Sequence, residues 1–152
     1  MVHNNCYAEG FAVVTESDAA VKAEIDQLMR TFLGAFDNTD GRRPDLEVIR
    51  QIFLPQGTII SNIGANTVVY DLDGFIAPRA TMLTDGTLTG FSEWEVSERT
   101  EIGGTVAHRF SHYRKSGFHN GVWFEGGGCK TTQFVATAAG WRMASMAWDD
   151  PA

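Results

Sequence analysis

Hydrophobic residues recur every three or four positions in the first third of the chain and at every second position in much of the last third. The first pattern predicts an amphipathic helix that Ser17 or Asp18 caps and that ends near residues 37–38. Its apolar stripe consists of Ala20, Val21, Ile25, Leu28, Met29, Phe32, Leu33 and Phe36. A second helix is expected between Pro44 and Pro55, because proline is favoured in a first helical turn and stops a helix further on.

The middle of the chain predicts a hairpin and a third helix. Two β-branched runs, residues 57–64 and 67–73, flank a Gly-Ala-Asn turn, which is typical of a hairpin. Asp71 or Asp73 can cap the short helix that follows, and Pro78 should bend it.

The last third predicts four antiparallel strands. They cover residues 91–102, 105–115, 122–138 and 141–148, with a loop at 116–121. Gly126 to Gly128 interrupt the third of these strands, which indicates a bulge or a strong bend. Helices that precede an antiparallel sheet indicate an α+β fold. We expect a loose leader over residues 1–16 and a single domain over 17–150.

Composition excludes several classes of function. The formal net charge is −7, and a nucleic-acid binder needs a basic face to neutralise phosphates. No stretch is apolar enough to span a membrane, and no signal peptide is indicated, so we expect a soluble, cytoplasmic protein. Cys6 and Cys129 show no metal-ligand spacing and are interpreted as reduced thiols rather than a disulfide. We expect no metal and no cofactor.

Several segments resemble the nuclear transport factor 2-like superfamily, and in particular small bacterial SnoaL-like proteins. They are the long first helix, "IFLPQGTI", the helix after "YDLDGF", "AHRFSHY" and the terminal "GWRMASMAWDD". The resemblance covers roughly residues 18–150. It implies a cone-shaped, cystatin-like α+β fold with three N-terminal helices against a curved, mostly antiparallel sheet. The superfamily includes polyketide cyclases, scytalone dehydratases and ketosteroid isomerases, so the resemblance leaves the activity open.

The ketosteroid isomerase residues are absent from the matching positions. Phe32 stands where the phenol is expected, Ser61 or Asn62 where the carboxylate base is expected, and Thr132 near the late carboxyl group. Phe32 has no proton to donate, and neither Ser61 nor Asn62 is a base near neutral pH. Proton abstraction by that set of residues is therefore not expected.

His108 is the first candidate for catalysis. It shares a strand face with Val106, Phe110, His112 and Arg114, because residues two apart on a strand point the same way. If this face lines a cavity, His108 can act as a general acid or base, with Glu98 or Asp149 orienting it. If the face is convex, the two histidines are structural or belong to a subunit contact. Glu98 could itself be a base of raised pKa if the Trp94 face looks inward, or its strand could pair with arginines of the next one.

Aromatic residues suggest the wall of a ligand pocket. By the resemblance Trp148 lies at the cavity wall, and strand alternation puts Met146, Ala144 and Arg142 on its face. The alternative for Trp148 is simple core packing. The proposed ligand-contacting set, with its rim residues, is Phe32, Tyr70, Arg79, Trp94, Phe110, Trp123, Met146 and Trp148.

Two functions remain open from the sequence. One is a cofactor-independent isomerase, dehydratase or cyclase that acts on a small apolar or aromatic molecule by general acid–base catalysis. The other is a non-catalytic, dimeric ligand-binding or accessory module. A homodimer through the sheet is expected, because a strand face with Phe110, Tyr113, Trp123 and Phe134 is too apolar to face water.

Overall fold

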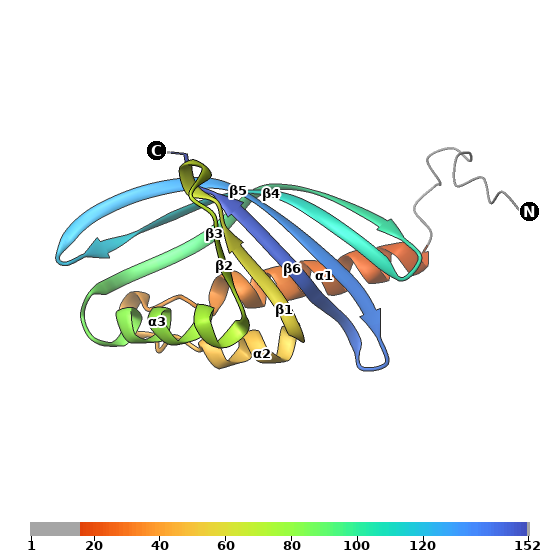
Figure 1. Cartoon of the computed structure of the whole chain (residues 1–152), viewed down its shortest axis with the longest axis horizontal. Coiled ribbons are helices and arrows are strands. Elements are labelled where there is room, and N and C mark those ends of the chain that lie inside the picture. Colours follow the sequence, from red (N-terminus) through yellow and green to blue (C-terminus); the bar gives the residue numbers. More distant parts are fainter. Residues whose placement is uncertain (1–15, 152) are drawn as a thin grey trace, which may run out of the picture.

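A curved six-stranded sheet covered on one face by helices forms the body of the molecule (Figure 1). The computed structural model describes residues 16–151. Its helices and strands run in the order α1 (Glu16–Gly34), α2 (Ile49–Ile52), β1 (Phe53–Ser61), β2 (Val68–Tyr70), α3 (Leu72–Thr84), β3 (Leu88–Gly103), β4 (Val106–His119), β5 (Val122–Thr137) and β6 (Gly140–Asp149). Short 3₁₀ turns lie at Thr39–Gly41, Leu46–Val48 and Ile63–Ala65. The α+β class predicted from the sequence is confirmed.

The strand order is β2-β1-β6-β5-β4-β3, and all neighbours are antiparallel except β1 and β6. The inner face of this sheet is the concave one, which packs on the helices; the outer face has no helix over it among residues 16–151 (Figure 1). The core between the layers is apolar, and Phe32, Phe134, Met143 and Met146 have at most 1% of their surface exposed. Within residues 16–151, no helix is long and apolar enough to cross a membrane.

The elements near the N-terminus differ in detail from the sequence prediction. α1 begins at Glu16, so Ser17 and Asp18 lie in its first turn rather than at its cap. The second helix is shorter than expected, because Phe53 already starts β1 and Pro55 lies within that strand. The cap of α3 is Asp71, whose carboxylate accepts a hydrogen bond of 2.7 Å from the Gly74 amide. The rest of the predicted leader, and Cys6 with it, lies outside the described residues.

The long strands continue further than predicted. β4 runs to His119, so residues 116–119 belong to the strand and only Asn120 and Gly121 form the turn. The pairing of β4 with β5 passes through Gly126 to Gly128 without a register shift, so no bulge lies there. These glycines permit close approach instead: a Cβ on Gly128 would lie 2.0 Å from the Asp149 carbonyl oxygen.

Asn38 ties the end of α1 to the corner between α3 and β3. Its side-chain amide donates to the carbonyl oxygens of Leu83 at 3.0 Å and Leu88 at 2.8 Å. Its side-chain oxygen accepts from the Phe91 amide at 2.7 Å. One half-buried amide thus satisfies three backbone groups, and it fixes the part of the cavity wall that Leu83, Leu88 and Phe91 provide.

Candidate functional site: a cavity under the concave sheet

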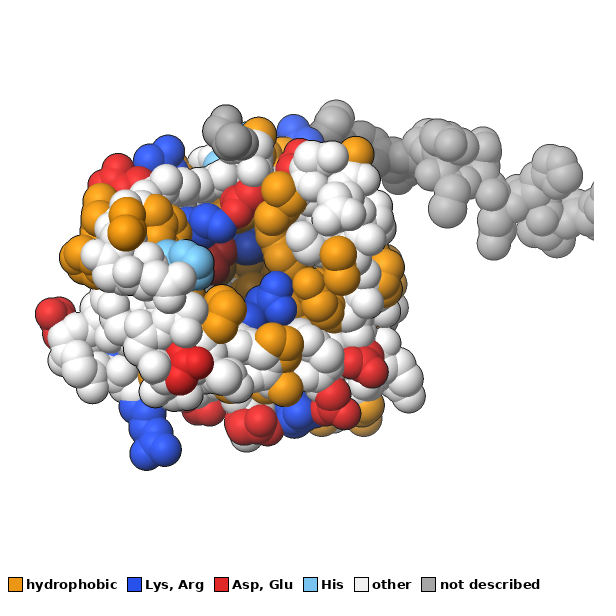
Figure 2. Space-filling model, turned by 60° about the vertical axis from the view of Figure 1, so that its left-hand side comes forward, with side chains coloured by type: hydrophobic (Ala, Val, Ile, Leu, Met, Phe, Trp, Pro, Cys, Tyr) orange, Lys and Arg blue, Asp and Glu red, His pale blue; other side chains and the backbone are white. Residues whose placement is uncertain are grey.

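A cavity of about 590 Å³ lies between the inner face of the sheet and α3. Figure 2 shows the hollow, with hydrophobic side chains around it and basic side chains and a histidine at its edge. Most of its wall is aromatic, and the residues concerned are Phe32, Phe36, Phe75, Phe91, Phe124 and Trp148. A space of this size, with mostly apolar walls, has the dimensions of a small-molecule site.

Phe75 of α3 stands at the centre of the aromatic wall. Its ring centroid lies 6.1 Å from that of Phe32, 6.0 Å from that of Phe36 and 6.1 Å from that of Trp148. The contacts with Phe36 and Trp148 are edge-to-face, which the ring quadrupoles favour. α1, α3 and β6 therefore present a rigid aromatic surface to the cavity.

Glu93 of β3 and Lys130 of β5 form an ion pair of 2.8 Å inside the cavity. The two side chains are only 9% and 6% exposed. The Lys130 ammonium also lies 3.8 Å from the centroid of the Tyr113 ring and 5.3 Å from that of Trp148. The lysine is thus held by one carboxylate and two aromatic faces, which together compensate for its loss of water.

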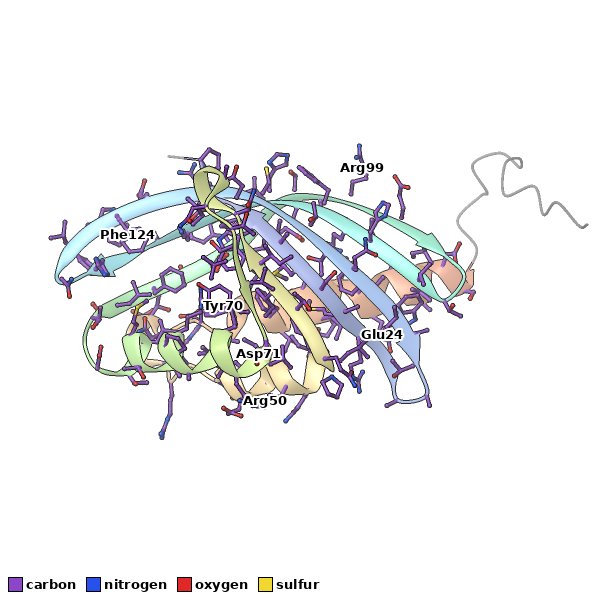
Figure 3. The ribbon with its side chains drawn as sticks, viewed as in Figure 1. Glu24, Arg50, Tyr70, Asp71, Arg99 and Phe124 are labelled. Carbon is purple, nitrogen blue, oxygen red and sulfur yellow. The ribbon has the colours of Figure 1, made fainter. Side chains whose placement is uncertain are left out.

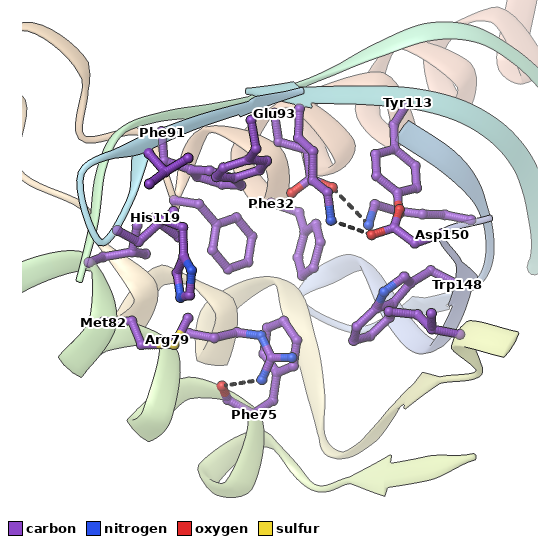
Figure 4. Close-up of a pocket in the computed structure, with 18 residues that line it drawn as sticks. Phe32, Phe75, Arg79, Met82, Phe91, Glu93, Tyr113, His119, Trp148 and Asp150 are labelled. Carbon is purple, nitrogen blue, oxygen red and sulfur yellow. Dashed lines mark hydrogen bonds and ion pairs between the residues drawn. The ribbon is translucent and has the colours of Figure 1, made fainter. Parts of the chain in front are cut away.

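Tyr113 of β4 donates a short hydrogen bond to Asp150, which also forms an ion pair with Lys115 (Figure 4). Burial raises the pKa of the Tyr113 phenol above its ordinary value of 10.0, and the hydrogen bond to the Asp150 carboxylate raises it further. The phenol therefore stays protonated near neutral pH and acts as a hydrogen-bond donor.

Arg79 of α3 faces these pairs from the opposite side of the cavity (Figure 4). Its guanidinium carbon lies 4.0 Å from the centroid of Phe75, 5.0 Å from that of Tyr70 and 5.7 Å from that of Trp148. It donates one hydrogen bond, of 3.2 Å, to the carbonyl oxygen of Phe75. No carboxylate among residues 16–151 forms an ion pair with it, in contrast to Lys115 and Lys130.

The polar groups favour binding over strong base catalysis. Both carboxylates that line the cavity, Glu93 and Asp150, are paired with lysines. Each carboxylate is thus engaged by an ammonium group, and it would have to leave that partner to act as a base on a ligand. Within residues 16–151, no three metal-ligand side chains come together that could hold a metal ion.

Comparison with known proteins identifies the fold. The sequence matches no family model, and a search of curated proteins finds no significant relative. A nuclear transport factor 2-like superfamily protein from Salmonella enterica serovar Typhimurium has a similar structure, with a TM-score of 0.71, 16% identity and coverage of 88% of this chain and 93% of that one. A protein from Kribbella flavida gives a TM-score of 0.70 at 18% identity, over 87% of this chain and 91% of that one. An uncharacterised protein of cystatin-like fold from Caulobacter vibrioides gives 0.67 at 14% identity, over 88% and 91%.

The chain has the nuclear transport factor 2-like fold. This agrees with the resemblance that the sequence segments carry. At these identities the likeness concerns the fold alone, so any function has to be argued from the cavity itself.

Within this nuclear transport factor 2-like fold, three of the residues proposed from the sequence line the cavity: Phe32, Arg79 and Trp148. Tyr70 lies just behind them, under the sheet beside α3 (Figure 3); its ring contacts the Arg79 guanidinium and meets Phe75 edge-to-face. Of the positions that ketosteroid isomerases use, Ser61 and Thr132 are buried in their strands and Asn62 is exposed.

His108 lies on the outer face, away from the cavity. Its side chain is 55% exposed, and its Nε2 is 3.5 Å from a carboxylate oxygen of Glu101. It shares a face with Phe110 as predicted, but this face is the convex one. Trp94 and Trp123 lie on the same face, 45% and 50% exposed. The position of His108 therefore agrees with the second alternative from the sequence, in which the face that carries the two histidines is convex.

Glu98 is on the inner face but at the other end of the sheet, where it pairs with Lys22 at 2.8 Å. Burial alone would raise the pKa of Glu98, but hydrogen bonds from Lys22 and Thr100 and the charge of Arg109 hold it below 4.5. Of the two alternatives, the base with raised pKa is therefore wrong, and the strand pairs instead with Arg109 of β4, which contacts Glu95 and Glu98. A register shift between Glu95 and Ser97 places Trp94 and Glu98 on opposite faces.

β6 contains a similar shift, so strict alternation fails there too. The register changes between Gln133 and Phe134 of the partner strand, opposite Ala144, and Arg142 therefore does not share the inner face of Trp148. Met146 is on that face but belongs to the core, being 1% exposed. Asp149 pairs with Cys129 on the outer row, and its neighbour Asp150 enters the cavity instead.

Sequence reasoning missed most of the polar cavity residues, which are Glu93, Tyr113, Lys115, His119, Lys130 and Asp150. One signal for Lys130 was present. It shares a strand row with Thr132 and Phe134, and a lysine on the same strand face as a phenylalanine indicates a charge that needs a partner if that face is buried.

Proposed function

We propose that the chain is a SnoaL-like protein whose cavity binds one small, mostly apolar, aromatic molecule. The observation that supports it is the aromatic hollow of about 590 Å³, with two lysine–carboxylate pairs on the sheet side and Arg79 of α3 opposite them. Apolar walls supply affinity through burial, and the few polar groups orient the ligand.

A cavity-filling variant tests this proposal. Met82 lines the cavity, so Met82→Trp should reduce the affinity for 2-naphthol, measured by calorimetry, by about tenfold or more through steric exclusion. Val69→Trp, at a residue of β2 that is 63% exposed and does not line the cavity, is the matched control and should bind like the parent protein. Equal binding by both variants would show that the ligand does not occupy this cavity.

A second candidate is cofactor-independent acid–base catalysis, such as an isomerisation, dehydration or cyclisation. The convergence of Tyr113, Asp150 and Lys115 favours it, because the phenol can turn its single proton from Asp150 to a substrate oxygen that gains charge. Under this hypothesis Tyr113→Phe lowers kcat while the affinity for substrate changes little. If Tyr113→Phe instead lowered the affinity for substrate and left kcat unchanged, the residue would act in binding alone.

We also propose a homodimer formed through an outer patch on β3, β4 and β5. The patch consists of Trp94, Val96, Phe110, Phe118 and Trp123, each at least 36% exposed. Tyr113 and Phe134 do not belong to it, since both are buried under the sheet. A second copy is the occupant we favour because a two-fold axis brings the same apolar patch of each copy together.

A further inference from the structure

The cavity carries an excess of positive charge, although the chain as a whole is acidic. Its charged lining residues are Arg79, Lys115 and Lys130 against Glu93 and Asp150. Besides Tyr113, the lining also contains His119, and an imidazole carries no negative charge that could offset this excess. The formal charge of the chain is −7, so the positive cavity is a local feature.

The excess is located at Arg79. Each lysine is neutralised by its own carboxylate, Lys115 by Asp150 and Lys130 by Glu93. Arg79, in contrast, has only the backbone carbonyl of Phe75 as a hydrogen-bond acceptor among residues 16–151. A guanidinium carries five N–H donors, so most of its donors are left for a ligand or for water.

The aromatic rings hold the guanidinium in place without consuming these donors. Phe75, Tyr70 and Trp148 surround it at 4.0, 5.0 and 5.7 Å. Stacking orders the planar group through its faces, while its N–H bonds point outward in its own plane. A pre-ordered guanidinium loses little freedom on binding and matches the two oxygens of a carboxylate.

We propose that the ligand is an aromatic monocarboxylate, or a close analogue with one anionic group, whose anion binds Arg79 while its ring lies against the phenylalanine wall. This inference rests on the proposed function of the cavity and names the ligand class. The lysine–carboxylate pairs and the Tyr113 phenol then face the other end of the ligand and accept a neutral polar group there (Figure 4).

Binding of 2-naphthoate and its neutral isostere 2-naphthamide to the full chain tests the proposal. Calorimetry should show 2-naphthoate binding about tenfold tighter than the amide, as expected for charge-assisted hydrogen bonds. Arg79→Gln should remove this preference and leave the affinity for the amide unchanged. Arg79→Lys keeps the positive charge but not the planar guanidinium with its paired N–H donors, so its preference for the carboxylate should lie between those of the parent and Arg79→Gln. Arg99→Gln, at an outer-face residue whose side chain is 79% exposed, is the control (Figure 3).

The outcomes separate the two proposals. If the amide and the carboxylate bind equally well, or if Arg79→Gln keeps the preference, the anion site is refuted and the cavity function stands. If neither compound binds to a protein that unfolds cooperatively, both proposals are overturned. The thermal unfolding midpoint of each variant shows that a change in binding does not come from a loss of folding.

Discussion

Lys130 and Glu93 meet at 2.8 Å on the inner face of the sheet, from strands that are separated by β4. Both charges are nearly removed from water, so each depends on the other. A buried pair contributes little net stability compared with an apolar pair, but an isolated buried charge is costly.

Breaking this pair should therefore destabilise the protein strongly. Glu93→Gln or Lys130→Met should each lower the free energy of unfolding by about 3–5 kcal/mol in urea denaturation. The double variant Glu93→Leu/Lys130→Met should recover most of that loss. Glu101→Gln, at a side chain 64% exposed, is the control and should stay within about 0.5 kcal/mol. Losses below about 1 kcal/mol for both single variants would contradict a solvent-excluded pair.

The Tyr113 phenol should resist ionisation. Because burial and Asp150 raise its pKa, the folded state keeps this proton at pH values where the unfolded chain, with a pKa near 10.0, releases it. The contribution of this phenol to the free energy of unfolding should accordingly be fully present below pH 10 and be lost as the pH rises above that value. Spectrophotometric titration should show a tyrosinate signal that appears only on unfolding, and Tyr113→Phe should remove it. Tyr70→Phe should leave it in place. A Tyr113 that ionises like a free tyrosine in the folded protein would refute the arrangement.

A second charged cluster, distant from the cavity, should govern acid sensitivity. Arg109, 4% exposed, pairs with Asp26 and Glu95, and Lys22 links Asp26 to Glu98 at 2.7 and 2.8 Å. Burial by itself would raise the pKa of Asp26, but hydrogen bonds from Arg109 and Lys22 hold it below 3.8. A depressed pKa means that the contribution is present above the unfolded value and lost as the pH falls through the folded one.

Urea denaturation at neutral pH and at about pH 3 measures this contribution. The parent protein should lose stability on acidification, and Asp26→Asn should be less stable at neutral pH but lose less between the two conditions. Glu125→Gln, at an exposed carboxylate of β5 outside the cluster, provides the control. Parallel pH profiles for Asp26→Asn and the parent would show that the cluster does not contribute.

Gly128 should not tolerate a side chain. A Cβ at this position would lie 2.0 Å from the Asp149 carbonyl oxygen, so Gly128→Ala must push β5 and the end of β6 apart. We expect a loss of about 1–3 kcal/mol in thermal or urea unfolding, together with weaker ligand binding, because Asp150 moves with β6. Gly34→Ala, with open space around its Cβ, should change stability by less than about 1 kcal/mol. Similar stability for the two variants would contradict the close approach.

The outer patch should determine the oligomeric state. Phe110→Arg places a charge in the middle of the patch and should shift the mass found by sedimentation from twice 16.7 kDa to 16.7 kDa at micromolar concentration. Val69→Arg, at an exposed residue of β2 on the other edge of the sheet, should leave the mass unchanged. A parent protein that sediments at 16.7 kDa would refute the homodimer.

Periodicity predicted the elements well because most of them have a single buried face. The stripe of α1 contains residues such as Ile25, Met29 and Phe32, each at most 1% exposed, and the β1–β2 hairpin lies where the β-branched runs placed it. The resemblance supplied the curvature of the sheet and the position of Trp148.

Alternation of polar and apolar residues does not tell which face of a strand is concave. For this reason the sequence placed His108 in the cavity, although it lies on the outer face. The rows of β4 that contain His108 and Tyr113 both mix apolar and polar residues. Only the packing of α1 on the sheet shows that the Tyr113 row is the inner one. The register shift after Glu95 then moved Glu98 to the face opposite Trp94, because one inserted residue inverts the alternation downstream. Asp150 was missed since it follows the last strand, where no pattern gives its direction.

The parallel pairing of β1 with β6 has a kinetic consequence. Ile59 of β1 pairs with Met146, which lies near the C-terminal end of the described residues. The aromatic contacts from Phe32 through Phe75 to Trp148 likewise form only once β6 is in place. Contacts so distant along the chain make closure slow, and they form late. A ribosome-bound nascent chain that still lacks its final strand would therefore hold the helices and the β3–β4 ribbon but have no receptor for a ligand.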